Sequence, residues 1–483
     1  MRITIHQPES RTGVPEENLR ALVDTARGVA EECDAVFAPL GSVEGGLLAL
    51  EGEVSFMSEA RARYTEQLLG EAARMLLRNP VMLVVPVRFP EGVRHAVLNE
   101  GRVTFADPAE GIRLPDGTRV ALREDAPGDI FWNSALRHTV WDELPLPVSP
   151  SRPVLSMSLG GAERTEIFRG ESFFTDGVKA VALPRFERAR ASFEWNRGEA
   201  LEGPETVPTA SLRADREAVL YEALVKSVRS YVARSFLRGG VVLGISGGVD
   251  SALCAAVAVD ALGADRVCGV LLASRYTSEE SRTLARSLCN GLGIELHERS
   301  IESLHELAVK EFEPDVGALP VGDVTDQNIQ ARLRCLWLMS IANHRNALML
   351  CSSNKAEAAM GYGTLYGDVA GGFAPIVDLW KADVRRLCYE SNRRAGAERI
   401  PEALIEREPT AELRPGQKDS DSLPPYDTIE AVMERVFAGE PLERKERELA
   451  ERAARFAFKR LQAPCGLRLS PVTLADWDRA RGF

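Results

Sequence analysis

The sequence is poorest in features that would tie the chain to a membrane, to nucleic acid or to disulfides. Its eight cysteines are scattered with no CxxC pair, which suits reduced thiols better than disulfide bridges or a zinc site. There is no long basic run, and the net charge of −12 argues against a nucleic-acid partner. No apolar run approaches a membrane span, and Met1 to Gln7 is typical of a strand, not of a signal peptide. We therefore expect a cytoplasmic protein that binds neither membranes nor nucleic acid.

What the sequence does contain is enough apolar material for ordinary hydrophobic cores. It has 483 residues, of which 45% are hydrophobic and 27% charged, which excludes a disordered chain. The length corresponds to about three average domains, and two large ones fit equally well. We predict an α/β unit over residues 1–195, a linker over 196–214 and a second unit over 215–483.

Hydrophobic periodicity predicts alternating strands and helices in both units. In the first unit we expect strands at 2–7, 35–39 and 81–87, helices at 16–32 and 58–77, and a hairpin within 95–103. In the second we expect helices at 218–236, from 250 to a stop at Gly263, from a capping box at 277–280 and from 323, with strands at 241–245, 267–274, 294–297 and 347–351. The second pattern predicts a doubly wound parallel sheet that binds its ligands at the carboxyl ends of the strands.

A glycine turn joins the strand at 241–245 to the helix that follows it. The turn reads Ser246-Gly-Gly-Val-Asp-Ser251, and glycines there let unpaired backbone N–H groups and a helix N-terminus approach an anion. It is not the loop GxxxxGK[ST], because no lysine follows the glycines. Asp250 would repel a phosphate unless a cation lay between them, so the turn predicts a magnesium–pyrophosphate complex.

These residues resemble the pyrophosphate loop of the ATP pyrophosphatases, a group that includes NAD, GMP and asparagine synthetases and tRNA-thiolating enzymes. Segments downstream distinguish among these members. They are similar to the synthetase half of two-domain, glutamine-dependent NAD synthetases, in the following motifs: Asn354-Lys-x-Glu357, Gly361-Tyr362, Tyr366-Gly-Asp368, Pro375-Ile-x-Asp-x-x-Lys381 and the segment 411–425. Leu365 stands where single-domain synthetases have a lysine, which favours the two-domain kind.

The resemblance implies a ligase that adenylates deamido-NAD (nicotinic acid adenine dinucleotide) with ATP and releases pyrophosphate. Ammonia then displaces AMP to give NAD. Relatives of this kind also suggest a homo-oligomer. Asp250 and Lys381 are the implied catalytic residues, with Lys381 neutralising phosphate charge. The implied ATP-binding residues are Gly244, Ile245, Ser246, Gly247, Gly248, Val249, Asp250, Ser251, Ser352 and Lys381.

Asp250 and Glu357 are the candidate magnesium ligands, because they are hard carboxylates at two strand ends that we expect to be adjacent. The alternative is that both are helix N-terminal acids favoured by the helix dipole. The implied contacts to the dinucleotide substrate are Asn328, Arg332, Glu357 and Lys418, with Lys418 in a polar loop that can close as a lid. The alternative for Arg332 is a solvated helix face.

The first unit resembles the carbon–nitrogen hydrolase (nitrilase) domain, which implies a four-layer α/β sandwich. That family cleaves glutamine with a Glu, a Lys and a Cys. Here Ala38-Pro39-Leu40 replaces Phe-Pro-Glu, no lysine precedes Lys179, and the one cysteine before Cys254 is Cys33, outside the expected nucleophile position. The segment 129–136, where that cysteine is expected, has none. Candidate replacements for the missing catalytic residues are Glu44, Ser134 and His138, although nothing in their spacing favours a hydrolytic site.

We therefore expect an NAD synthetase with a degenerate glutaminase-like domain, which uses free ammonia or ammonia from a separate glutaminase. One alternative is a glutamine-dependent enzyme with an unrecognised nucleophile. Another is a regulatory protein that binds ATP and a dinucleotide without turnover. Pyrophosphate release by the wild type and by Asp250→Ala separates that regulator from an enzyme.

Overall fold

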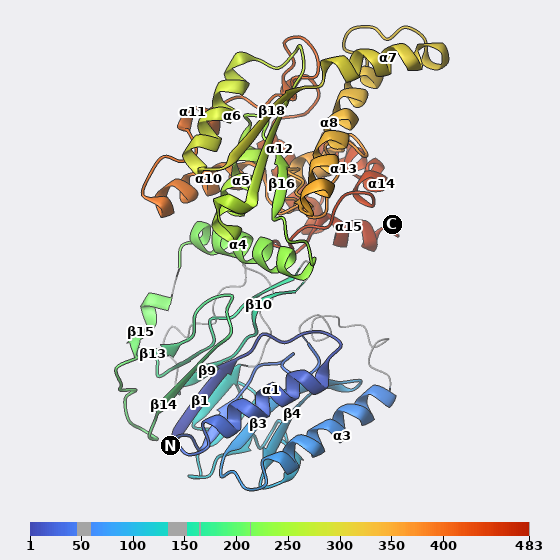
Figure 1. Ribbon diagram of the computed structural model, residues 1–483. Coiled ribbons are helices and arrows are strands. Elements are labelled where there is room, and N and C mark those ends of the chain that lie inside the picture. Colours follow the sequence, from blue (N-terminus) through green and yellow to red (C-terminus); the bar gives the residue numbers. More distant parts are fainter. Residues whose placement is uncertain (46–58, 134–151, 164–165, 213, 483) are drawn as a thin grey trace. The chain divides into compact units, whose positions relative to one another are not determined.

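The computed structural model describes residues 1–45, 59–133, 152–163, 166–212 and 214–482, and the chain divides into two compact units between Asp215 and Arg216 (Figure 1). Each unit combines sheets with helices, which agrees with the α/β class predicted from the sequence. Within the described ranges, no helix is both long enough and apolar enough to cross a membrane.

The first unit contains a mixed six-stranded sheet in the order β14-β1-β2-β3-β4-β5. Its first three strands in the chain pair in parallel, and the predicted hairpin forms from β4 and β5. The strands are β1 (Arg2–Gln7), β2 (Ala35–Phe37), β3 (Met82–Phe89), β4 (Gly92–Asn99), β5 (Arg102–Phe105) and β14 (Ala189–Glu194).

Alternation of side chains along these strands separates two cores. Leu83 and Val85 of β3 face a cluster formed with the apolar stripes of α1 (Pro15–Gly28) and α3 (Glu59–Met75). Met82 and Val84 face the opposite side, where they pack in a cluster that includes Trp132 of the second sheet. Helices, first sheet and second sheet therefore form three successive layers in the described residues.

The second sheet has seven strands in the order β15-β13-β12-β9-β8-β7-β6. Part of the predicted linker belongs to it, because Lys179 and Ala180 pair with Pro208 and Val207. A separate two-stranded sheet is formed by the antiparallel strands β10 (Gly160–Glu163) and β11 (Glu166–Arg169). The seven strands are β6 (Ile112–Arg113), β7 (Arg119–Ala121), β8 (Ile130–Asn133), β9 (Val154–Ser156), β12 (Phe173–Thr175), β13 (Lys179–Ala182) and β15 (Val207–Pro208), which a 3-10 turn, η2 (Thr209–Leu212), follows.

The second unit is built on the predicted parallel sheet, in the order β18-β17-β16-β19. Val242 and Val270 face α8 (Val324–Arg345) and pack with its Leu338 in one core. β17 and β19 lie on opposite sides of β16, so the direction in which successive strands are added to the sheet reverses at β16. The strands are β16 (Val241–Gly244), β17 (Val267–Ala273), β18 (Glu295–Ser300) and β19 (Leu348–Met349).

The four helices predicted for this unit, α4, α5, α6 and α8, begin close to the predicted positions, with one difference at α6. Ser278, not Thr277, is its N-cap, since the Ser278 hydroxyl accepts from the N–H of Ser281 at 3.1 Å. The helices are α4 (Arg216–Arg234), α5 (Val249–Leu262), α6 (Glu279–Leu292), α7 (Glu302–Val316), α8 (Val324–Arg345), α9 (Lys355–Met360), α10 (Lys381–Ala395), α11 (Glu402–Glu406), α12 (Tyr426–Phe437), α13 (Arg444–Arg455), α14 (Ala457–Arg460) and α15 (Leu474–Ala480).

Candidate functional site

The glycine turn after β16 is preformed by its own hydrogen bonds. The Ser246 and Ser251 hydroxyls lie 3.2 Å apart, and Ser246 Oγ accepts from the N–H of Gly248 at 3.2 Å. Gly247 has a φ of +80°, and a Cβ there would lie 2.5 Å from the carbonyl oxygen of Ser281. Only glycine fits this position. The turn ends at the N-terminus of α5, where backbone N–H groups favour an anion.

A buried ion cluster lies beside this turn. Lys381, the first residue of α10, places its Nζ 2.5 Å from Asp250 Oδ2 and 3.7 Å from Glu357 Oε1. The exposed fractions of the three side chains are 6% for Lys381, 16% for Asp250 and 18% for Glu357. The structure therefore brings together both predicted metal ligands and the predicted phosphate-neutralising lysine.

Asn354 explains why the two carboxylates face each other. Its side chain caps α9 by accepting from the N–H of Glu357 at 3.0 Å, while Glu357 reaches back to the N–H of Asn354. The same amide donates to Asp250 Oδ1 at 2.9 Å. Because β16 and β19 are neighbours, the helices that follow them start side by side, as the sequence predicts. Both acids also lie in the first turns of their helices, so the helix-dipole interpretation applies as well.

Asp419 is a third carboxylate at this cluster, and the sequence reasoning missed it. It accepts hydrogen bonds from the hydroxyls of Tyr362 at 3.0 Å and Tyr426 at 2.7 Å, and it is buried. Its charge contributes to the raised pKa of both Glu357 and Lys381. The sequence does show an acid-rich segment directly after Lys418, with Asp419 and Asp421. It does not indicate which of the two carboxylates points into the protein.

Charge is unbalanced in this cluster. Burial, and then the neighbouring Asp250, raise the pKa of Glu357 to about 8. Burial lowers the pKa of Lys381, but Asp250 and Glu357 outweigh that effect and raise it above its ordinary value. Three carboxylates with one ammonium carry two excess negative charges when all are ionised. Hard oxygen ligands with excess negative charge fit Mg²⁺, which prefers one or two carboxylates together with phosphates.

A small pocket adjoins Glu357 on the side of α14. It has a volume of about 20 Å³, room for one molecule of the size of water or ammonia. Ser353, Gly361, Lys459 and Arg460 are among the residues that line it.

Asn328 and Arg332 lie along one face of α8, as predicted, and both contact the segment that follows Gly363. Asn328 Oδ1 accepts from the Thr364 hydroxyl at 2.7 Å, and Arg332 Nε donates to the carbonyl oxygen of Leu365 at 3.2 Å. The two candidate substrate-binding residues are therefore tied to the segment that carries the Tyr366-Gly-Asp368 motif.

Ser352 and Lys418 lie at two different kinds of position. Ser352 is half-buried on the connection from β19 to α9, two residues before Asn354. Lys418 is 57% exposed and pairs with Glu408 at 2.8 Å. Within the described residues, the ammonium of Lys418 contacts that surface acid, whereas its neighbour Asp419 joins the buried cluster.

In the first unit, the described residues include only one of the three substitutes considered for hydrolysis. Glu44 is buried, and its Oε1 accepts from the N–H of Arg88 at 3.0 Å. Burial raises the pKa of Glu44 to about 7. Cys33 is buried in the helix-side core, where burial raises the pKa of its thiol. Ser134 and His138 lie outside the described residues.

Comparison with known proteins identifies the family of the second unit. A family model described as NAD synthase matches residues 220–462, which is half of the chain. A glutamine-dependent NAD(+) synthetase from Rhodobacter capsulatus is 41% identical over 302 residues, covering 60% of this chain and 53% of that protein. Its counterpart from Aquifex aeolicus is 36% identical over 341 residues, covering 67% of this chain and 56% of that protein. The chain thus spans about half the length of the curated relatives it matches.

Two solved structures share the fold over nearly the whole chain. Glutamine-dependent NAD+ synthetase from Acinetobacter baumannii, in complex with ADP, has a TM-score of 0.70 at 23% identity and covers 98% of this chain and 97% of that one. Its counterpart from Cytophaga hutchinsonii has a TM-score of 0.74 at 17% identity, with 98% and 96% covered. At these identities the likeness concerns the fold alone, and it confirms the two-part α/β architecture predicted from the sequence.

Proposed function

This chain belongs to the NAD synthase family, and from that premise we propose that it makes NAD by ATP-dependent amidation of deamido-NAD, releasing AMP and pyrophosphate. One observation carries the proposal: the preformed glycine turn after β16 lies against the cluster of Asp250, Glu357 and Lys381. The turn can bind phosphate, and the excess carboxylate charge beside it can bind Mg²⁺. Together they fit a triphosphate whose charge is offset by a metal ion.

The chain's own residues divide the work of adenylation. The N–H groups between Ser246 and Val249, together with the Ser246 and Ser251 hydroxyls, bind the phosphates of ATP. Asp250 and Glu357 would hold Mg²⁺, which, when bound, offsets phosphate charge and favours departure of pyrophosphate. Lys381 supplies a fixed positive charge beside the phosphates. The deamido-NAD carboxylate attacks the α-phosphorus, and the bond from that phosphorus to the bridging oxygen breaks.

Amide formation then needs only a nucleophile of small size. Ammonia attacks the acyl carbon of the adenylate, AMP leaves with the electron pair of the broken C–O bond, and ammonia loses a proton. The pocket beside Glu357 has room for such a molecule. Asn328 and Arg332, the substrate contacts that the resemblance implies, would hold the dinucleotide beside the segment after Gly363 to which they are hydrogen-bonded.

The nitrogen source of this chain is ammonia, free or supplied by a separate glutaminase. The supporting observation is chemical: Cys33 is the single cysteine before Cys254, and it is buried with a raised thiol pKa, so it is a poor nucleophile. The relatives' names favour a second candidate, a glutamine-dependent enzyme that uses another nucleophile.

The test measures NAD formation from ATP and deamido-NAD with ammonium or with glutamine in ammonia-free buffer. We expect turnover with ammonium alone. Glutamine-driven turnover at a comparable rate would instead establish the second candidate, and Cys33→Ser would show whether that thiol takes part. Pyrophosphate release by the wild type and its loss in Asp250→Ala would distinguish either enzyme from a regulator that only binds nucleotides. Asp265→Asn, an exposed acid outside the cluster, is the matched control.

A further inference from the structure

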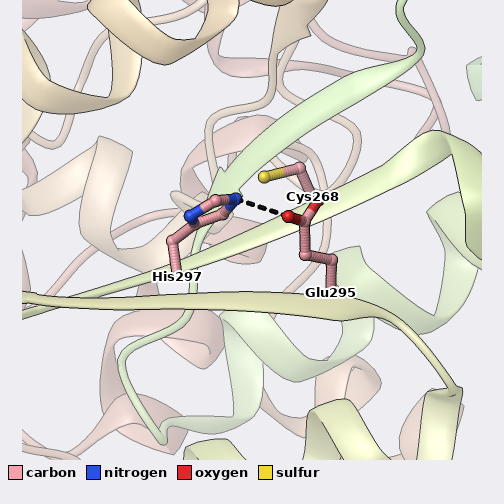
Figure 2. Close-up of side chains that lie close together, drawn as sticks. All are labelled: Cys268, Glu295 and His297. Atoms are coloured by element: carbon pink, nitrogen blue, oxygen red, sulfur yellow. Dashed lines mark ion pairs between the residues drawn. The ribbon is translucent and has the colours of Figure 1, made fainter.

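A second group of potential metal ligands lies at the opposite edge of the same sheet. The register pairs Cys268 with Glu295 and Val270 with His297. Since alternate residues of a strand share a face, the thiol, the carboxylate and the imidazole all lie on one side of the sheet. Their donor atoms lie within 4.8 Å of one another, and Figure 2 shows the three side chains pointing together from the two strands.

This group is separate from the proposed active site. Cys268 pairs with Val242 near the start of β16, four residues before the glycine turn begins at Ser246. At about 3.3 Å per residue, that distance is roughly 13 Å along the strand. The active site uses the carboxyl ends of the strands, whereas Cys268 and Glu295 lie at the amino ends. A ligand here cannot be part of the phosphate site.

The group already holds a cation. Arg345, the last residue of α8, donates from one guanidinium nitrogen to Glu295 Oε2 at 2.7 Å and to His297 Nε2 at 2.9 Å. Glu295 Oε1 lies 2.8 Å from the same Nε2, so the carboxylate and the imidazole already face each other. The Arg345 side chain is 34% exposed, so it can swing into solvent. The buried thiol of Cys268 is a third potential metal ligand, in addition to the carboxylate and the imidazole that Arg345 contacts.

We propose that Cys268, Glu295 and His297 form a zinc site, in which the metal replaces Arg345 as the bound cation. A thiolate, an imidazole and a carboxylate are the ligand types that Zn²⁺ takes, and the sulfur selects it over Mg²⁺. With bonds of about 2.0–2.3 Å, tetrahedral donors stand roughly 3.3–3.8 Å apart, so the widest donor separation must shrink by about 1 Å and the Glu295 and His297 donors must move apart by about 0.5 Å. Glu295 is 50% exposed and His297 30%, which leaves them free to do so.

Binding releases the thiol proton to solvent and leaves the fourth position to water. The metal would join β17 to β18 beside the end of α8. The three donors have no metal-ligand spacing in the sequence, because they come from two separate strands and meet only through the register of those strands.

The test uses the full chain without an affinity tag, titrated separately with Zn²⁺ and with Co²⁺. We expect one metal per chain and, for Co²⁺, the absorption band of a metal–thiolate bond. Cys268→Ser and His297→Gln should each weaken binding by at least about 10–100-fold, the usual effect of losing even a group that only supports a ligand. Arg345→Ala should strengthen it about tenfold, since a competing positive charge is removed.

Two control variants keep the test specific. Cys465→Ser removes an exposed thiol, and His344→Gln removes an exposed imidazole next to Arg345. Both should bind metal as the wild type does. Equal binding by Cys268→Ser and wild type, a cobalt complex without the thiolate band, or no binding even by Arg345→Ala would each overturn the proposal. In those cases the group is an ion pair beside a buried thiol.

Discussion

The Nζ of Lys381 lies 2.5 Å from Oδ2 of Asp250, although 131 residues of chain separate them. Both side chains are largely buried, and the ammonium also approaches Glu357. Lys381 therefore occupies the position between two carboxylates that a divalent cation would share with phosphate. In the proposed mechanism, bound Mg²⁺ would offset the excess negative charge of the carboxylates, and the ammonium of Lys381 would then lie beside a phosphate of ATP.

Replacement of Lys381 by methionine should lower kcat by about 10²–10³-fold, the usual effect of removing one preorganised charge from a reaction site. The cause is loss of positive charge beside the phosphates. Pyrophosphate release is the measurement, with Lys445→Met, an exposed lysine of α13, as the control. Equal activity of the two variants would remove Lys381 from the mechanism.

Asp419→Asn should lower activity about tenfold, because the amide cannot accept from both Tyr362 and Tyr426 with equal strength. The matched control is Asp421→Asn, which changes an acid of the same segment that pairs with Arg414 on the surface. Steady-state kinetics at saturating ATP distinguish the two. A larger effect of Asp421→Asn than of Asp419→Asn would contradict the position that we give to Asp419.

Gly247→Ala should weaken ATP binding and destabilise the second unit by about 1–2 kcal/mol or more, since a left-handed backbone costs that much for a residue with a Cβ. The added methyl would also lie 2.5 Å from the Ser281 oxygen. Gly396→Ala is the control, because its φ of +64° is similar but nothing lies within 4 Å of the added Cβ. Calorimetric ATP titration and thermal unfolding should show a larger loss for Gly247→Ala.

Lys355→Met should destabilise the chain by about 3–5 kcal/mol, because the buried Asp378 carboxylate loses its only positively charged partner among the described residues and keeps only hydrogen bonds from Leu469 and Ser470. Lys355 is fully buried, lies 2.9 Å from Asp378 and donates to Ser470 at 2.8 Å. Lys310→Met, on the exposed face of α7, should leave urea unfolding unchanged. If the double variant Lys355→Met with Asp378→Asn were no more stable than Lys355→Met alone, the unpaired carboxylate would not be the cause.

Glu44 should make stability fall as pH rises. Burial raises its pKa from 4.5 to about 7, so the folded state binds more protons than the unfolded state across that interval. The contribution of Glu44 to stability is complete below pH 4.5 and is lost as pH rises through about 7.

Glu44→Gln should therefore gain stability relative to wild type across the interval, by at most about 1.4 kcal/mol per pH unit, and no further above it. Urea unfolding at a series of pH values is the measurement, with the exposed Glu32→Gln as control. A difference between Glu44→Gln and wild type that does not change with pH would show that Glu44 keeps its ordinary pKa in the folded protein.

Local pattern was sufficient for the strands and helices that the sequence analysis predicts and for the glycine turn after β16. The apolar run of β16, the glycines after it and the alanine-rich α5 lie within about one supersecondary unit, where periodicity and turn chemistry act over a few residues. The same local rules were misleading at the predicted linker. Val207 and Pro208 have little apolar pattern of their own, and they become a strand only because β13 offers them a partner.

The sequence by itself determined the parallel sheet, the turn with Gly247 and the acids at two strand ends. Tertiary structure alone decided that Asp419 faces Tyr362 and Tyr426 while Lys418 stays at the surface, and that Lys381 stands between Asp250 and Glu357. The physical reason is the separation along the chain of the residues that interact. Helices and strands form from neighbours a few residues apart, whereas the charges of the cluster meet only after loop closure across tens to more than a hundred residues.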